Sequence, residues 1–129
     1  MKTERFFNSF RILLILGLFM FTLTNCNKES EITCNLNASA PAEGVDIEIT
    51  YKAIATGDGT ITSLTYTSST GNITVTNPEL SWTITTLVPA NTPISIVATG
   101  TVKNGSLEVT YSGNGGNIMG IDNCSQSSN

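Results

Sequence analysis

The sequence predicts an all-β domain that follows an N-terminal signal helix. In several short runs of the chain, apolar residues recur at every second position, and clusters rich in Gly, Asn and Pro separate these runs. Two-residue alternation is typical of strands with one buried face. No stretch after the first 25 residues repeats apolar residues at three- and four-residue spacing, so no long helix is expected within the domain.

The first 25 residues have the layout of a secretory signal. Lys2, Arg5 and Arg11 form a charged start, and an apolar run follows over 12–21. This run is too short to cross a hydrocarbon core, which needs about 20 residues, so a cleaved signal is favoured over a transmembrane helix.

A lipidation site follows the apolar run. The segment Leu23-Thr24-Asn25-Cys26 resembles the lipobox of bacterial lipoproteins, in which an aliphatic residue lies three positions before the lipidated cysteine. The resemblance implies that Cys26 receives a diacylglycerol, becomes the first residue of the mature protein and is then acylated on its amine. Two or more acyl chains anchor a protein stably, whereas one does not. We therefore expect membrane attachment without a spanning segment; the alternative is an ordinary signal with a chance cysteine.

The residues after Cys26 carry a second resemblance. The segment Asn27-Lys28-Glu29-Ser30-Glu31 is similar to the acidic segment that sends some Bacteroidota lipoproteins to the outer face of the outer membrane. This similarity implies that Lys28, Glu29 and Glu31 form a surface-export tether. We expect an outer-membrane location, with display on the cell surface favoured over a periplasm-facing position. A merely soluble linker is the alternative.

Length and charge limit the partners of the mature chain. Residues 26–129 suffice for one domain, and we expect a tether over 26–33 and a single domain over 34–129. Three lysines stand against nine acidic residues, a formal charge of about −6. Nucleic-acid binding requires a basic footprint, so it is not expected. Anionic headgroups should not attract the domain either, which leaves the lipid as its membrane contact.

Two cysteines remain for the domain. Cys34 and Cys124 lie near its two ends, and an even count in an exported chain predicts a disulfide between them. Closing a loop of about 90 residues contributes roughly 4 to 5 kcal/mol on the chain-entropy model. Two free thiols or a metal pair are the alternatives. The chain has no His and no CxxC motif, so a zinc site lacks ligands and no metal or cofactor is expected.

The alternation predicts strands within six segments, each bounded by turn residues. These segments are 45–51, 60–67, 73–75, 80–84, 94–98 and 107–111. Ile61 is out of phase with Leu64, which indicates a bulge between them. Asn104-Gly105 lies between two apolar alternations and is the strongest hairpin signal. Six or seven strands without a covering helix predict two sheets packed face to face, as in an immunoglobulin-like β-sandwich, with a small barrel as the alternative.

The stretch 51–115 resembles the MmpS family of small membrane-anchored proteins and its lipoprotein relatives. The residues that carry the resemblance are Tyr51-Lys52-Ala53-Ile54-Ala55-Thr56-Gly57, Ser63-Leu64-Thr65-Tyr66-Thr67 with Gly71, Leu80-Ser81-Trp82, Ile94-Ser95-Ile96-Val97-Ala98, Leu107-Glu108-Val109-Thr110-Tyr111, and Gly113 or Gly115. Relatives commonly carry Pro-Trp where this chain has Ser81-Trp82. The resemblance implies an immunoglobulin-like sandwich held at a membrane. MmpS proteins are associated with lipid transporters, but the partner of this chain is not encoded in it.

Catalytic groups are scarce. Without His, the Ser-His and Cys-His arrangements are excluded. A Ser-Lys dyad through Lys52 or Lys103 is disfavoured, because each lysine fits a solvated charge better. Asp46 and Glu48 share a predicted strand face about 7 Å apart, where a polar outer face is favoured over a carboxylate pair. We therefore expect no enzymatic activity.

Two further motifs fit structural roles better than binding. Gly57-Asp58-Gly59 offers only one carboxylate, which favours a turn over a calcium loop. Trp82 is in phase with Leu80 and Ile84, and Tyr51 and Tyr111 also lie on apolar phases. Core packing is therefore favoured over a ligand platform for these rings.

Two functions remain from different classes. The favoured one is a non-enzymatic accessory or structural subunit of an envelope complex, and the alternative is a small module that binds a glycan or lipid. Cys34 lies eight residues after Cys26, so the fold starts within roughly 27 Å of the bilayer. A protein partner should therefore be membrane-proximal.

Overall fold

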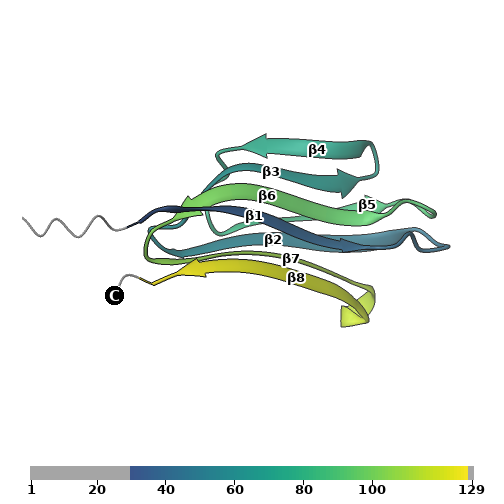
Figure 1. Ribbon diagram of the computed structural model, residues 1–129. Coiled ribbons are helices and arrows are strands. Elements are labelled where there is room, and N and C mark those ends of the chain that lie inside the picture. The colour runs from purple at the N-terminus through teal and green to yellow at the C-terminus, as the bar shows by residue number, and fades with distance from the viewer. Residues whose placement is uncertain (1–29, 128–129) are drawn as a thin grey trace, which may run out of the picture.

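The computed structural model describes residues 30–127, which form two four-stranded antiparallel sheets packed face to face (Figure 1). The strands are β1 (Ile32–Ala40), β2 (Ile47–Gly57), β3 (Thr60–Ser68), β4 (Gly71–Thr76), β5 (Trp82–Val88), β6 (Ile94–Val102), β7 (Gly105–Gly113) and β8 (Ile118–Gln126), and a single 3₁₀ turn, η1 (Asn114–Gly116), precedes β8. The predicted signal helix and the lipidation site lie outside the described residues.

The predicted β-sandwich is confirmed. One sheet has the order β1-β6-β3-β4 and the other the order β5-β2-β7-β8, and the two are not closed into a barrel. The described chain has eight strands, more than the expected six or seven. The strand order differs from the A-B-E-D and C-F-G order of immunoglobulin constant domains, so the likeness to that class lies in the two-sheet architecture.

The two strands that the sequence pattern missed are the first and the last. On β1 the inward side chains are Cys34, Leu36 and Ala38, two of which are small. On β8 the pattern is inverted, because the large apolar side chains of Met119 and Ile121 are 72% and 59% exposed. A strand with its apolar residues on the outside carries no signal of a buried face.

Three side chains predicted to face inward are exposed. Val45 is 64% exposed because it precedes the first residue of β2, and Leu80 is 37% exposed because it precedes β5. Ile73 is also 37% exposed, although it lies on the inner side of β4. The reason is that β4 packs against β3 and has little contact with the second sheet.

The central strands follow the predicted pattern. The predicted inward residues of β6 and β7 are all buried, namely Ile94, Ile96, Ala98, Leu107, Val109 and Tyr111. The predicted bulge is confirmed, since the register of β3 against β6 shifts between Ile61 and Ser63. These strands lie in the middle of their sheets, where one whole face meets the other sheet.

The predicted Asn104-Gly105 hairpin is wrong. The turn exists, but β6 pairs with β1 and β3 while β7 pairs with β2 and β8, so the turn joins strands of different sheets. Gly105 has φ +140°, whereas Asn104 does not have the positive φ that a type I′ hairpin turn requires. Both backbone N–H groups of Lys103 and Asn104 instead bind the Asp58 carboxylate of the neighbouring turn.

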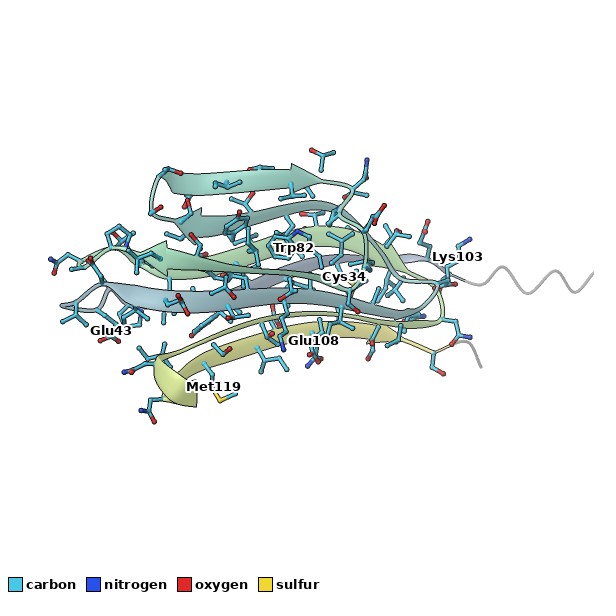
Figure 2. The ribbon with its side chains drawn as sticks, turned by 180° about the vertical axis from the view of Figure 1, so that it is seen from behind. Cys34, Glu43, Trp82, Lys103, Glu108 and Met119 are labelled. Atoms are coloured by element: carbon cyan, nitrogen blue, oxygen red, sulfur yellow. A yellow bond between two sulfur atoms is a disulfide. The ribbon has the colours of Figure 1, made fainter. Side chains whose placement is uncertain are left out.

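Both ends of the described chain lie at the same end of the sandwich. Ile32 of β1 pairs with Val102, and Gln126 of β8 pairs with Gly105, so both ends adjoin the turn between β6 and β7. Figure 2 shows Lys103 at this end and Glu43 at the opposite one. The connections 41–46, 69–70, 89–93 and 114–117 lie at that opposite end, which we call the distal end.

Candidate functional site

A disulfide joins the two sheets along one side of the sandwich. Cys34 on β1 and Cys124 on β8 are bonded across 90 positions of sequence, with their Cα atoms 5.9 Å apart. These strands are edge strands of different sheets. The predicted disulfide is therefore confirmed, and it joins the two sheets as well as the two ends of the domain.

Two hydrogen bonds reinforce the same side. The Asp122 carboxylate points inward from β8 and accepts a 2.8 Å hydrogen bond from the backbone N–H of Asn37. The Tyr111 hydroxyl donates to the carbonyl of Ser39 at 3.2 Å. Both bonds satisfy backbone groups of β1, and an inward-pointing charge on an edge strand is a known protection against pairing with another chain. We call this side, formed by β1 and β8, the closed side.

A shallow pocket of about 500 Å³ lies at the distal end, on the outer face of the second sheet. Its floor contains Glu48, Thr50 and Ser112, three outward side chains of the neighbouring strands β2 and β7. Residues 45–47 form a first wall of the pocket, and residues 113–116 form a second. The sequence pattern gave no sign of this pocket, because its two wall segments meet only when β2 pairs with β7.

Hydrogen bonds from two backbone N–H groups hold the first wall of the pocket. The backbone N–H of Ala90 donates to Asp46 Oδ1 at 2.8 Å, and the backbone N–H of Asn91 donates to the Glu43 carbonyl at 2.6 Å. The connections 41–46 and 89–93 are thereby tied together. Glu48 lies on the outer face of β2, as predicted. Asp46 does not lie on this strand, because it precedes β2, and its carboxylate binds the β5–β6 connection.

The second wall has backbone conformations that favour glycine. Asn114, Gly115 and Gly116 have φ values of +50°, +65° and +91°. A Cβ added to Gly115 or Gly116 would meet no atom within 4 Å, so the glycines are needed for conformation and not for space.

The pocket combines acceptors and hydroxyl groups. Asp46 and Glu48 supply carboxylates, Thr50 and Ser112 supply hydroxyls, and no Lys or Arg is among the lining residues. Such a set suits a ligand that carries hydroxyl or amine donors and disfavours an anion.

The remaining candidate residues lie outside the pocket. Lys52 lies exposed on the outer face of β2, and Lys103 lies exposed in the β6–β7 turn. Asp58 accepts hydrogen bonds of 2.9 Å from the backbone N–H groups of Lys103 and Asn104. These donors, Asn104 first and then Lys103, hold the pKa of the Asp58 carboxyl below its ordinary value of 3.8. The segment Gly57-Asp58-Gly59 therefore forms a turn that binds the β6–β7 turn through the Asp58 carboxylate.

The predicted core position of the aromatic rings is confirmed. Tyr66 lies between Tyr51 and Trp82, with ring centroids 5.4 and 5.3 Å away, and Trp82 is partly buried. The fully buried Tyr51 hydroxyl has no hydrogen-bond partner among the described residues. Burial raises the pKa of Tyr51 to about 12.

The residues of the predicted lipid anchor and tether are described only in part. Cys26, Lys28 and Glu29 lie outside the described residues, while Glu31 is exposed directly before β1. No helix within residues 30–127 is long and apolar enough to cross a membrane. In the same range, no three His, Cys, Asp or Glu side chains come together in a way that would hold a metal ion.

Comparisons with protein-family models, curated proteins and solved structures find no match for this chain. The resemblances to bacterial lipoproteins and to the MmpS family therefore stay predictions from the sequence.

Proposed function

We propose that this protein is an outer-membrane lipoprotein, anchored through Cys26, that serves as a non-enzymatic accessory or structural subunit of an envelope complex. The lipid would be its membrane contact, and a membrane-proximal protein would be its partner. Display on the cell surface is favoured over a periplasm-facing position because of the acidic tether at Lys28, Glu29 and Glu31.

The observation that carries this proposal is the position of the first strand relative to the anchor. β1 begins at Ile32, six positions after Cys26, so an extended tether spans about 20 Å. The disulfide at Cys34 holds β1 in the sandwich, so the tether cannot lengthen by releasing this strand. A domain held so closely meets partners in the same membrane or directly beside it.

Membrane fractionation and co-purification test the proposal together. The wild-type chain should remain with membranes and, after mild detergent extraction, co-purify with a membrane protein in a fixed ratio. Replacing Cys26 with Ser should release the chain, and Thr33→Ser on the exposed face of β1 serves as the matched control that should not. Membrane retention of the Cys26→Ser chain without a mass shift would contradict the anchor, and a wild-type chain that is monomeric in every extract would contradict the subunit.

Protease treatment of intact cells tests the orientation. Digestion of the wild-type domain, with protection after Glu29→Ala and Glu31→Ala, supports surface display. Full protection of the wild-type domain alongside digestion of a known surface protein would contradict it.

The pocket favours a second candidate function, a module that binds a hydroxyl-rich ligand such as a glycan. Calorimetric titration of the purified protein with neutral oligosaccharides tests it. Glu48→Gln should weaken binding, whereas Glu108→Gln should not, because Glu108 lies on the outer face of the same sheet but outside the pocket. Equal affinities for the two variants would exclude the pocket as the binding site.

A further inference from the structure

The two lateral sides of the sandwich differ in whether their edge strands are bonded to each other. On the closed side, the disulfide and Asp122 join β1 to β8, and the Tyr111 hydroxyl joins β1 to β7. On the other side the edge strands are β4 and β5, and no disulfide or hydrogen bond joins them within residues 30–127. In Figure 1, β4 is the outermost strand of the molecule on that side. We call this side the open side.

The strand β4 lacks the usual devices that prevent pairing with another chain. Its sequence from Gly71 to Thr76 has no charged residue and no Pro. Its pairing with β3 runs without a register shift from Ser63 opposite Thr76 to Ser68 opposite Gly71. Natural edge strands are commonly protected by Lys, Pro, bulges or inward charges. β1 has such protection from Asp122, and β4 has none.

The inner side of β4 is also incompletely covered. Ile73 and Val75 face the same side as the buried Tyr66 and Leu64 opposite them, yet Ile73 is 37% exposed. Val75 is partly buried against the core, as are the inward Trp82 and Ile84 of β5, so the uncovered apolar side chain on this side is Ile73. The open side thus offers an unpaired backbone edge on β4 with apolar surface beneath it.

We propose that β4 is the docking edge for an extended strand of a partner protein, which adds to the first sheet as its fifth strand. The partner segment would have about the six residues of β4, no charge, and β-branched side chains at alternate positions to cover Ile73 and Val75. Charged side chains would be poorly placed over the apolar Ile73 and Val75. An acidic segment would in addition meet a protein that is itself acidic. This inference rests on the proposed role as a subunit and names its contact.

A second copy of this chain fits the edge less well. Antiparallel pairing of two β4 strands by a two-fold axis would reverse the long axis of one sandwich. The Ile32 ends would then lie at opposite ends of the dimer, separated by more than a strand length of about 30 Å. A tether of about 20 Å then holds both copies to one membrane only if the sandwiches lie flat against it. A strand from another protein carries no such restriction.

Peptide binding followed by NMR tests the proposal on the mature chain 26–129 carrying Cys26→Ser. The probe is a synthetic peptide with the sequence of residues 71–77, which has the composition expected of the partner strand. Shifts of the backbone amides and slower hydrogen exchange should appear in β4. A peptide N-methylated at alternate residues, which lacks the donors for pairing, should produce neither change.

Matched variants locate the edge. Thr74→Lys with Thr76→Lys places two charges on the exposed outer face of β4 and should abolish the shifts. Thr33→Lys with Asn35→Lys places the same charges on the same face of the sheet, at β1 on the closed side. This variant should leave the peptide-induced shifts in β4 unchanged. Thermal unfolding of both variants verifies that they fold; if the β4 variant does not, the N-methylated peptide decides.

Other results would overturn the proposal. Absence of shifts at millimolar peptide, shifts confined to β1, β5 or β8, or equal effects of the two variants would exclude β4 as the edge. A concentration-dependent dimer in sedimentation that Thr74→Lys with Thr76→Lys dissolves would assign the edge to a second copy. Each of these outcomes leaves the co-purification result standing, so failure of the docking edge is distinguishable from failure of the subunit role.

Discussion

The backbone N–H of Asn37 on β1 donates a 2.8 Å hydrogen bond to Oδ2 of Asp122 on β8. The other oxygen, Oδ1, accepts from the backbone N–H of Asn123 at 2.9 Å. One carboxylate therefore binds edge strands of both sheets. It acts beside the disulfide and gives the closed side a contact that depends on charge.

Replacing Asp122 with Ala should lower the free energy of unfolding by about 1–2 kcal/mol, because the Asn37 N–H loses its charged acceptor. Asp122→Asn retains an acceptor oxygen and should cost less. Urea denaturation measures both values, and amide hydrogen exchange at Asn37 should accelerate in the Ala variant. Equal stability of wild type and Asp122→Ala would show that water replaces the carboxylate without loss.

Removing the disulfide should destabilise the domain strongly. Cys34→Ala with Cys124→Ala frees a loop that spans 90 positions, for which the chain-entropy model gives a loss of about 4–5 kcal/mol. A domain of this size has little stability to spare, so a large drop in Tm is expected. Wild type treated with reductant should reproduce the drop, while reductant should not affect the double variant. Two free thiols in non-reducing mass spectrometry of the wild type would contradict the bond.

The buried Tyr51 hydroxyl should make stability fall at alkaline pH. Its folded pKa of about 12 exceeds the ordinary value of 10.0, so between these values the unfolded chain releases a proton that the folded chain keeps. Stability is then lost as pH rises from 10 to 12, by about 2–3 kcal/mol from this group. Tyr51→Phe should flatten that part of the profile and should not lower stability at neutral pH, because the hydroxyl that it removes makes no hydrogen bond within residues 30–127. If the free energy of unfolding, measured in urea, falls equally with pH above pH 10 in wild type and in Tyr51→Phe, the assignment to Tyr51 is wrong.

Asp58 should make the β6–β7 turn sensitive to acid. Because its folded pKa lies below 3.8, its contribution is complete above that value and is lost as pH falls through the folded pKa. Asp58→Asn should therefore reduce the acid dependence of Tm. The matched comparison is Asp46→Asn, because the Asp46 carboxylate binds a single backbone N–H in the distal loops. Amide exchange at Lys103 and Asn104 should accelerate in Asp58→Ala, which removes the oxygen that accepts from both. Unchanged exchange at both amides would contradict the contact.

Local sequence patterns predicted the strands whose surroundings are simple. β6 and β7 lie in the middle of their sheets, so every second side chain is buried, and alternation at Ile94, Ile96 and Ala98 reports this directly. The disulfide was predictable for another reason. With Cys26 predicted to carry the lipid, two cysteines remained in a chain that was predicted to be exported, and pairing them required no knowledge of the fold.

Tertiary structure decided which strands meet. Alternation shows that one face of a strand is buried but not which strand lies beside it, so Asn104-Gly105 fits a hairpin and a crossing between sheets equally well. The contact with Asp58, distant in sequence, is formed only in the crossing. β8 could not be recognised from its own residues, because Asp122 and Cys124 face inward to bind β1 while Met119 and Ile121 face solvent. The pocket and the two unlike sides of the sandwich likewise arise from pairing between distant strands, for which a local pattern has no signal.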